Sequence, residues 1–369
     1  MDFDFSPEQE MLRASVRAFL SDKAPISYVR ECFANSQYHD SFAADHVWTG
    51  LRDLGVLGLL VPEEHGGAGM GFVDAAVVLE ELGRAVSPSP YASSAIGAVS
   101  LVAELGGEAA PELLRALADG SRVGTLAIYE EGTGYEWREP STTARPSSDG
   151  WLLSGQKVHV VDAPAVDLFL VTARDPDGVL GVFACSAVAE ETPIVDPTRY
   201  EGRLVLDTVA ARRLGDADAT AAIARTLDRL GVAYAVDGVG AAQRALELAV
   251  EYAKERVQFG KPIGSFQAVQ HLCADMLRTV ELGRAAAYYA CWANDDADAA
   301  EAHRAAVMAK AYAAEQFPVL GGTAIQVFGG IGFTWEHDIH LYYKRLLTAA
   351  VALGSADTYL DELANIAVD

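Results

Sequence analysis

The sequence is poor in the features that mark disulfide-rich, metal-binding or membrane-spanning proteins. Its 369 residues include only four cysteines, far apart and without a CxxC pair, so disulfides and zinc fingers are not expected and a reducing compartment fits. His337 and His340 have the i, i+3 spacing of a helical metal pair, but no third ligand is evident, so we predict no metal site. No stretch free of charges is long enough to cross a bilayer. The cysteines are Cys32, Cys185, Cys273 and Cys291.

Positive charge is also scarce. The chain carries 28 lysines and arginines against 52 aspartates and glutamates, a formal net charge of -24. Such a surface repels the phosphates of nucleic acid, which excludes that class of partner, and it cannot steer an anionic ligand from a distance. Any bound phosphate must therefore be held by local groups. The run from Met1 to Phe5 is acidic and unlike a signal peptide, so we expect a cytoplasmic protein without a membrane span.

The first third of the chain has a helical pattern. A chain of 369 residues is too long for one core and predicts about two or three domains. Ser6, Pro7 and Gln9 are typical of a helix start, with Ser6 as the N-cap and Gln9 as its partner in a capping box. The helical pattern continues beyond this start and predicts an N-terminal helical domain over residues 1–122.

The pattern changes to short β-type runs near Gly124. These runs are rich in Val, Leu, Ile and Phe, and Gly, Pro, Asp and Ser separate them. They predict a β domain over residues 123–213. The runs lie at residues 125–129, 151–153, 158–161, 168–171 and 179–183.

Helical periodicity returns and continues to the end of the chain. Leu246, Val250 and Ala253 lie on one face of a long helix that we expect to end at Gly260. Several long helices with short joints predict an antiparallel bundle over residues 214–369, and the chain as a whole is predicted to be mainly α with a middle β domain. The further helices are expected at residues 269–292, 299–319 and 338–351, with a last one starting near 355.

Two motifs interrupt the helices of the predicted bundle. Residues 256–267 begin with Arg256 and residues 326–333 begin with Gln326, and both continue with small, turn-forming residues. An arginine can bind a phosphate, and bare glycine backbone can lie close to a ligand. Together the motifs predict a place where two helices hold a bulky anionic cofactor such as a dinucleotide. Alternatively, Arg256 only balances a helix dipole and Gly329 opens an ordinary turn.

These two motifs resemble the two signatures of the acyl-CoA dehydrogenases, which are flavoproteins. Residues 61–69 (VPEEHGGAG), 80–84 (EELGR) and 153–157 (LSGQK) resemble that family too, in the same order. The chain is identified as a member on this basis. The resemblance implies an N-terminal helical domain, a small β-barrel domain and a C-terminal antiparallel four-helix-type bundle.

The resemblance also implies a cofactor and a reaction. Members of the family remove the α-proton of an acyl-CoA with a carboxylate and pass the β-hydrogen as hydride to FAD. The Arg and Phe of the first signature and the Gln and Gly of the second touch the FAD of the neighbouring subunit. The matching residues here are Arg256, Phe259, Gln326 and Gly330, with Gln258 and Gly329 beside them.

The region that would hold the chain's own flavin departs from the family. Val161 stands where a Thr of a Thr-Asn pair is expected, and valine donates no hydrogen bond. Glu130 and Glu131 stand where the family carries a Thr-Glu-Pro…Gly-Ser-Asp stretch, and we expect their charges to repel a reduced flavin. Alternatively, the loop has drifted and binds flavin through backbone groups, with Thr133 as a substitute donor.

The catalytic base is missing at both positions that the family uses. These positions correspond to Leu353, just before a Gly-Ser, and to Leu230 on the long helix, and leucine cannot accept a proton. Asp237 lies seven residues after Leu230, on a similar face but about 10 Å along the axis. Asp237 is the candidate for a relocated base, and the alternative is a buried polar group or helix-contact acid.

Three interpretations remain open. The first is a subunit of a flavin-dependent acyl-CoA dehydrogenase that lacks the catalytic Glu and completes a partner's FAD site; some bacterial members, including ones acting on sterol side chains, are heteromeric in this way. The oxidoreductase, acting in fatty-acid or sterol side-chain β-oxidation, is then active as an assembly. The second is a self-sufficient dehydrogenase that uses Asp237 or another relocated acid. The third is a flavin-free structural homologue. Homo- and hetero-oligomers are both compatible with the sequence.

Overall fold

Two compact units, interleaved along the chain, make up this computed structural model, which describes residues 5–34 and 42–368. One unit is formed by three segments, Met1–Val29, Ala76–Ser87 and Gly231–Asp369. The other is formed by Arg30–Ala75 and Pro88–Leu230. The predicted fold class, mainly helical with a middle sheet, is confirmed. The division into three domains at residues 122 and 213 stays a prediction.

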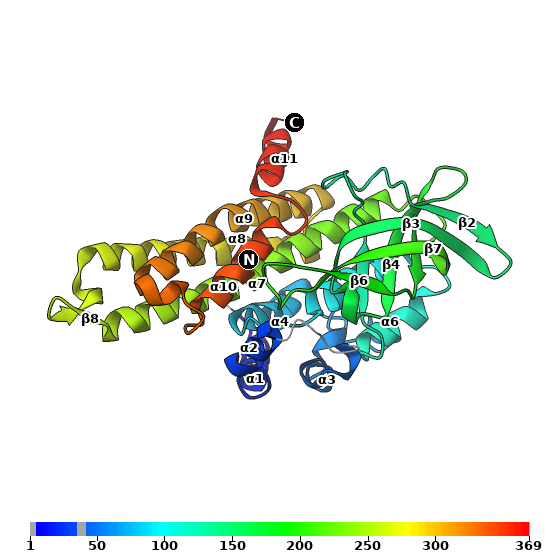
Figure 1. Cartoon of the computed structure of the whole chain (residues 1–369). Coiled ribbons are helices and arrows are strands. Elements are labelled where there is room, and N and C mark those ends of the chain that lie inside the picture. Colours follow the sequence, from blue (N-terminus) through cyan, green and yellow to red (C-terminus); the bar gives the residue numbers. More distant parts are fainter. Residues whose placement is uncertain (1–4, 35–41, 369) are drawn as a thin grey trace. The chain divides into compact units, whose positions relative to one another are not determined.

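Long helices build the first unit. Figure 1 shows α8 and α9 running side by side, and α9 also packs against α10 and α11. The α1 helix begins as predicted, because the Ser6 hydroxyl accepts the Gln9 N–H and the Gln9 side chain accepts the Ser6 N–H. The helices are α1 (Pro7–Lys23), α4 (Phe72–Arg84), α7 (Thr220–Glu255), α8 (Gln267–Asp296), α9 (Ala299–Phe328), α10 (Ile339–Val351) and α11 (Ala356–Val368), with short η6 (Ile263–Ser265) and η7 (Gly329–Phe333).

Two predicted helix ends in this unit were wrong. The α7 helix ends at Glu255 and not at Gly260, because a tight hairpin of β8 (Val257–Gln258) and β9 (Lys261–Pro262) follows it. The α9 helix continues to Phe328 rather than ending near residue 319, although Pro318 lies inside it. Tertiary packing overrides the proline, since the buried ring of Phe317 fills the space beside glycines of α7 and α8.

The second unit combines short helices with a sheet. The described helices include one π-helix, η4, whose residues are all buried. The first residues of α4 and of α7 and the last residues of α2 (Ile26–Ala34) belong to this unit, and the rest of these three helices belongs to the other. Its other helices are η1 (Phe42–Ala44), α3 (His46–Asp53), η2 (Val56–Gly58), η3 (Glu63–His65), η4 (Ala92–Ala98), α5 (Val99–Leu105), α6 (Ala110–Ala118) and η5 (Ala163–Ala165).

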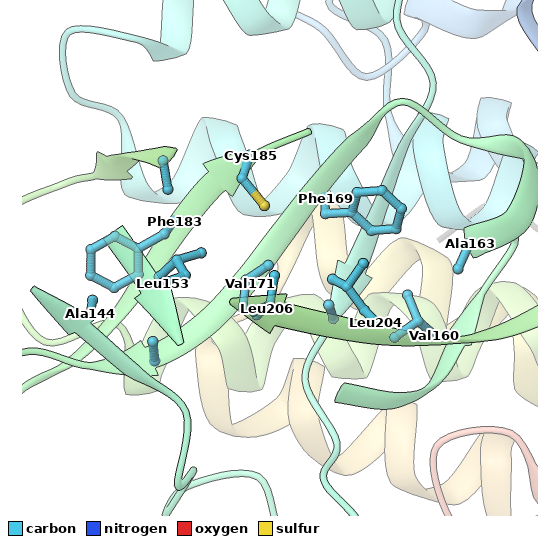
Figure 2. Close-up of a cluster of buried hydrophobic side chains, with 13 residues drawn as sticks. Ala144, Leu153, Val160, Ala163, Phe169, Val171, Phe183, Cys185, Leu204 and Leu206 are labelled. Carbon is cyan, nitrogen blue, oxygen red and sulfur yellow. The ribbon is translucent and has the colours of Figure 1, made fainter. Parts of the chain in front are cut away.

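The strands close into a small barrel. Their pairings run β4–β2–β3–β7–β5, and β5 pairs again with β4, while β1 lies parallel to β4 and β6 covers part of β7. The inward-facing side chains form a dry cluster around Phe169, Phe183 and Leu153 (Figure 2). The strands are β1 (Gly124–Ala127), β2 (Thr143–Ser147), β3 (Gly150–Val161), β4 (Leu168–Arg174), β5 (Leu180–Cys185), β6 (Ala189–Thr192) and β7 (Glu201–Leu214).

Neither membrane-spanning helices nor metal clusters are found in the part of the chain that the structure describes. None of its helices combines the length and the apolar character that a bilayer crossing needs. No three His, Cys, Asp or Glu side chains of residues 5–34 and 42–368 gather closely enough to hold a metal ion.

Candidate functional site

The hairpin after α7 presents the first predicted motif. The Arg256 N–H donates to the Tyr252 carbonyl at 2.8 Å and so closes the helix, and the Arg256 carbonyl accepts the Ile263 N–H at 2.8 Å and so closes the hairpin. The side chains of Arg256 and Gln258 are exposed. Both backbone groups of Arg256 are thus fixed, while its guanidinium stays available to a ligand.

Phe259 stands at the tip of this hairpin. Its ring is 92% exposed, and its φ of 54° lies in the left-handed region, which costs a residue with a side chain roughly 1–2 kcal/mol. The ring meets that of Phe266 edge-on at 6.1 Å between centroids. Gly264 supports the hairpin from behind, because a Cβ there would lie 2.9 Å from the Ala253 carbonyl oxygen. A strained, exposed aromatic tip on a well-fixed hairpin indicates a contact outside this chain.

The end of α9 presents the second predicted motif. Gln326 is exposed, and Gly329 ends the helix with a φ of 64° and donates its N–H to the Gln326 and Ile325 carbonyls. A Cβ added to Gly329 or Gly330 would meet no atom within 4 Å. The backbone at these two glycines is therefore open to a close approach from outside.

Aromatic rings bring the two motifs to the same end of the bundle. The Tyr252 ring, one turn before Arg256, lies 4.6 Å from that of Phe328, the last residue of α9. The His337 ring lies 4.1 Å from Phe328, and its Nδ1 accepts the Ile339 N–H at 3.1 Å. His337 therefore packs and caps at the start of α10. The six predicted cofactor residues lie on one hairpin and on one helix end, and their contact with FAD stays a prediction.

Asp237 is placed in the interior of the first unit. It is 1% exposed, in the middle of α7. Its carboxylate lies 3.9 Å from Nε of the buried Arg345, whose Nη2 donates to the Ser87 carbonyl at 2.7 Å. A carboxylate facing a buried guanidinium has the surroundings of a helix-contact acid, which is the alternative role that the sequence left open.

The two leucines at the expected base positions have apolar or backbone surroundings. Leu230 is buried, and both of its methyl groups lie 3.1–3.2 Å from where a Cβ on Gly97 would be, beside a methyl of Leu126. Leu353 lies half-buried between α10 and α11 with a φ of 64°. Hydrocarbon thus fills the first position, and a fixed, unusual backbone conformation marks the second.

The expected repulsion from Glu130 was wrong, because its carboxylate faces inward. Glu130 is buried and accepts hydrogen bonds from Nζ of Lys157 at 2.7 Å and from the hydroxyls and N–H groups of Ser141 and Thr142 at 2.5–3.0 Å. Burial alone would raise the pKa of Glu130, but these hydrogen bonds outweigh it and lower the pKa to about 2. Glu131, by contrast, is exposed near Gln156.

The place of the family's Thr-Asn pair is held by Val161 and Asp162. The Val161 carbonyl accepts the Thr125 hydroxyl at 2.6 Å. Asp162 is buried with a φ of 59°, and its Oδ2 accepts the Ser93 hydroxyl at 2.5 Å. Ser93 was not predicted from the sequence, and it lies 69 residues before its partner. This corner of the second unit is rigid, but it offers an acid where the family offers an amide.

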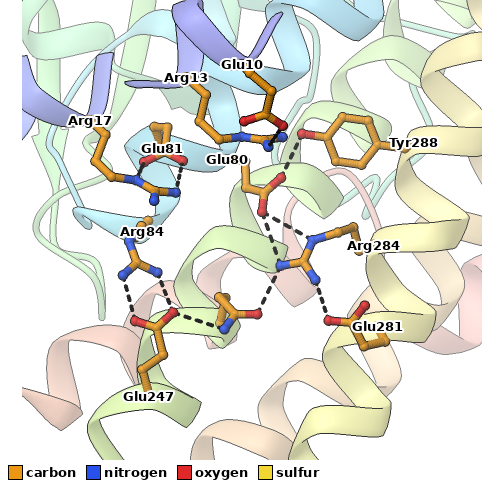
Figure 3. Close-up of polar contacts among 11 residues, drawn as sticks. Glu10, Arg13, Arg17, Glu80, Glu81, Arg84, Glu247, Glu281, Arg284 and Tyr288 are labelled. Carbon is orange, nitrogen blue, oxygen red and sulfur yellow. Dashed lines mark hydrogen bonds and ion pairs between the residues drawn. The ribbon is translucent and has the colours of Figure 1, made fainter. Parts of the chain in front are cut away.

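The EELGR motif builds a network of ion pairs between helices of the first unit (Figure 3). Glu81 accepts two hydrogen bonds from Arg17 of α1, and Arg84 donates two to Glu247 of α7. Glu80 binds Arg284 and the Tyr288 hydroxyl of α8 at 2.7–3.3 Å. A cavity of about 260 Å³ lies among these side chains. Because each guanidinium faces a carboxylate, we interpret the network as a tie between helices.

The chain matches family models at both ends and has similar solved structures. "Acyl-CoA dehydrogenase, N-terminal domain" matches residues 6–121, and "Acyl-CoA dehydrogenase, C-terminal domain" matches residues 210–367. Acyl-CoA dehydrogenase IpdE2 of Mycobacterium tuberculosis is 33% identical over 96% of each chain. A variant of the steroid ACAD Tcur3481-Tcur3483 is 34% identical, with 98% of both chains covered and a TM-score of 0.87. The ChsE4-ChsE5 complex of Mycobacterium tuberculosis is 26% identical, with 100% and 99% covered and a TM-score of 0.86.

Proposed function

This chain belongs to the acyl-CoA dehydrogenase family, and we propose that it serves there as the subunit that lacks the usual base and completes a partner's FAD site. One contrast carries the proposal. The groups that would serve a neighbour's cofactor are exposed and well supported on one end of the bundle. Both positions for the chain's own catalytic acid hold leucine, at Leu230 and Leu353.

The residues at the bundle end fit a dinucleotide held from outside. Arg256 offers a guanidinium for a phosphate, and Gln326 offers an amide that both donates and accepts. Gly329 and Gly330 leave the space that a flat or phosphorylated ligand needs, since a Cβ at either position would meet no atom within 4 Å. Phe259 would pack on the cofactor or on the partner. FAD, when bound, supplies the hydride acceptor, and the residues of this chain bind and orient it.

The surroundings of Asp237 support a chain without a base of its own. A general base must reach the α-carbon of a thioester, whereas Asp237 is 1% exposed and faces Arg345. We therefore assign Asp237 to the packing of α7 against α10.

Two of the similar structures support a second chain type. Tcur3481-Tcur3483 and ChsE4-ChsE5 are each named for two proteins, and the first is described as a steroid ACAD. We infer that this chain likewise pairs with a different, base-carrying dehydrogenase chain. The assembly would then dehydrogenate an acyl-CoA between the α- and β-carbons, with a steroid-derived acyl group as the leading candidate.

Co-expression with a candidate partner chain tests the proposal. The mixed assembly should be yellow and bleach with acyl-CoA, while this chain alone should hold little flavin and show no turnover. Arg256→Ala should lower the FAD content of the assembly, because a charge-assisted hydrogen bond is worth about 1.5–3 kcal/mol, roughly a tenfold or greater loss of affinity. Arg212→Ala is the matched control, since Arg212 forms an exposed pair with Glu112 on another surface. Bound flavin is measured by absorbance after gel filtration.

Asp237→Asn separates this proposal from a self-sufficient enzyme. In the mixed assembly we expect turnover to be nearly unchanged by this substitution, because Asp237 does not accept the α-proton of the substrate. If this chain instead purifies alone as a flavoprotein that acyl-CoA bleaches, and Asp237→Asn abolishes the bleaching, the helper role is wrong. A colourless chain that gains no flavin from any partner would point to a structural homologue.

A further inference from the structure

Lys310 lies fully buried in the first unit, on α9. Its Nζ donates to the Ala349 carbonyl at 2.9 Å and to the Ala350 carbonyl at 3.0 Å, both in the last turn of α10. The carbonyls of a last helical turn have no partner within the helix and carry its partial negative charge. The ammonium of Lys310 therefore caps the end of α10 from a neighbouring helix.

Tyr359 of α11 completes the surroundings of Lys310. The centre of its ring lies 5.2 Å from Nζ, within the range of a cation–π contact. Its hydroxyl donates to the Leu353 carbonyl at 3.3 Å. On the α7 side, Gly231 lies next to both, and a Cβ there would make ordinary contacts at 3.7 Å with the Lys310 stem and at 3.9 Å with the Tyr359 hydroxyl.

The turn that these two side chains hold has a strained backbone. Leu353 has a φ of 64° and Gly354 a φ of 150°, and a leucine in the left-handed region costs roughly 1–2 kcal/mol. A Cβ on Gly354 would lie 2.9 Å from the Tyr359 ring. The turn from Ala352 to Gly354 thus has an unfavourable backbone at Leu353, whose carbonyl Tyr359 binds, while Lys310 binds the carbonyls of Ala349 and Ala350 just before the turn.

Stability alone is a poor explanation for this arrangement. Removing an ammonium from water costs several kcal/mol, and burial lowers the pKa of Lys310 to about 7. Within the described chain, the contacts of Lys310 are carbonyls and a ring, without a carboxylate. A methionine would fill the same space at a lower cost. A strained backbone at Leu353, directly after a helix end that a buried lysine caps, indicates that the conformation of this turn matters.

We propose that Lys310 and Tyr359 are positioning residues that fix the Ala352–Gly354 turn, so that the side chain at position 353 is presented in a single orientation. The functional role of position 353 rests on the proposed function, since this position corresponds to one of the two positions at which the family carries its catalytic base. This chain has leucine there, and Tyr359 binds the backbone carbonyl of that residue.

Hydrogen exchange of the turn tests this proposal without any cofactor. Tyr359→Phe removes only the hydroxyl that binds the Leu353 carbonyl. We expect the backbone amides of residues 352–356 to exchange about three- to tenfold faster, the loss of one net hydrogen bond, with a fall in melting temperature no larger than that caused by Tyr312→Phe. Tyr312→Phe is the matched control, because the Tyr312 hydroxyl donates to the Thr279 carbonyl at the same distance of 3.3 Å. Lys310→Met should release the last turn of α10 as well.

The outcomes separate positioning from general stability. If Tyr312→Phe speeds exchange in the turn as much as Tyr359→Phe does, or if exchange in the turn stays unchanged, the proposal is overturned. A second measurement introduces Leu353→Glu into the flavin-loaded assembly. If the new carboxylate speeds flavin reduction, adding Tyr359→Phe should lower kcat and leave KM unchanged. An equal gain with and without the hydroxyl also overturns it. Absence of any gain bears only on whether a site in this chain holds flavin, which the proposed function does not require, and exchange then decides the role of Lys310 and Tyr359.

Discussion

At the scale of single residues, the Glu130–Lys157 pair places two opposite charges inside the barrel of the second unit. Nζ of the fully buried Lys157 lies 2.7 Å from Oε1 of Glu130 and also donates to the Ile128 carbonyl and the Thr172 hydroxyl at 3.0–3.2 Å. Taking an ion out of water costs several kcal/mol unless its hydrogen-bonding groups are satisfied. Each charge is therefore tolerated only because the other is present.

Lys157→Met should destabilise the chain strongly. It leaves the Glu130 carboxylate buried without its cation, and breaking a buried pair on one side costs about 3–5 kcal/mol. The free energy of unfolding is measured by urea titration at pH 7, followed by far-UV circular dichroism. Glu112→Gln, which removes one partner of the exposed Arg212–Glu112 pair, should change it by less than about 1 kcal/mol. Similar losses in both variants would contradict the assigned burial.

The same pair predicts a pH dependence on the acid side. The pKa of Glu130 is lowered from its ordinary value of 4.5 to about 2 in the folded chain. Its stabilisation is therefore present above pH 4.5 and is lost as the pH falls from about 4.5 to about 2. Unfolding free energies of Glu130→Gln should depend less on pH across this window than those of the unchanged chain. Parallel curves for the two proteins would show that Glu130 does not titrate in this way.

The residues of the site were predictable from the sequence only where a motif carried them. Arg256, Phe259 and Gln326 stand in short signatures that can be read along the chain, and the structure places them on a hairpin and a helix end. The inward direction of Glu130 could not be read, because Ser141, Thr142 and Lys157 lie 11 to 27 residues away. The surroundings of position 353 were equally hidden, since Lys310 caps the preceding helix end from another helix and Tyr359 binds the Leu353 carbonyl.

At the scale of elements, α4 and α7 cross at unusually short range. A Cβ on Gly83 would lie 1.9 Å from the Asp237 carbonyl oxygen, and one on Gly240 would lie 1.9 Å from the Glu80 carbonyl oxygen. No real Cβ tolerates such a distance, so only glycine permits the two backbones to meet. The close crossing also brings Arg84 within reach of Glu247.

Gly240→Ala should push the two helices apart and lower the free energy of unfolding by about 1–3 kcal/mol or more, the usual cost of overpacking. Gly322→Ala is the matched control in a helix interior, because a Cβ at Gly322 would meet no atom within 4 Å. There the higher helix propensity of alanine should raise stability by about 0.5–1 kcal/mol. Thermal unfolding of both variants measures the difference, and effects of the same sign would refute the close crossing.

The elements themselves could be predicted to different degrees. The starts of α1 and α9 follow from local capping and periodicity, and both were read within a residue. The long strand β7 was not recognised, because Arg203, Asp207 and Arg212 point outward and hide its buried alternate positions. Its pairing with β3 and β5 is set by distant strands, which single-sequence patterns do not reveal.

At the scale of the whole molecule, the first unit depends on segments from both ends of the sequence. Arg17 of α1 and the EELGR segment of α4 supply partners to Glu247, Arg284 and each other. Contacts within this unit therefore join residues more than 200 positions apart. When those segments are missing, several charged side chains of the C-terminal helices lose their partners.

A fragment of residues 214–369, the predicted third domain, should not fold by itself. It would expose the glycine face of α7 and leave Glu247 and Arg284 without the partners that α4 provides. We expect a broad, non-cooperative thermal transition by circular dichroism, and a sharp transition only for the full chain. A cooperative melt of the isolated fragment would instead support independent folding of that domain.

The exposed hairpin tip has a consequence for how the chain behaves in a cell. The Phe259 ring is exposed to water, and exposed apolar surface is a feature that chaperones and proteases recognise in unassembled subunits. Binding of a partner that covers the Phe259 ring would stabilise the complex by about 1.5–3 kcal/mol from the burial of that ring alone. If the chain pairs with a second chain as proposed, copies made in excess of that partner should be degraded faster than paired copies. Balanced synthesis of the two chains would then matter as much as their affinity.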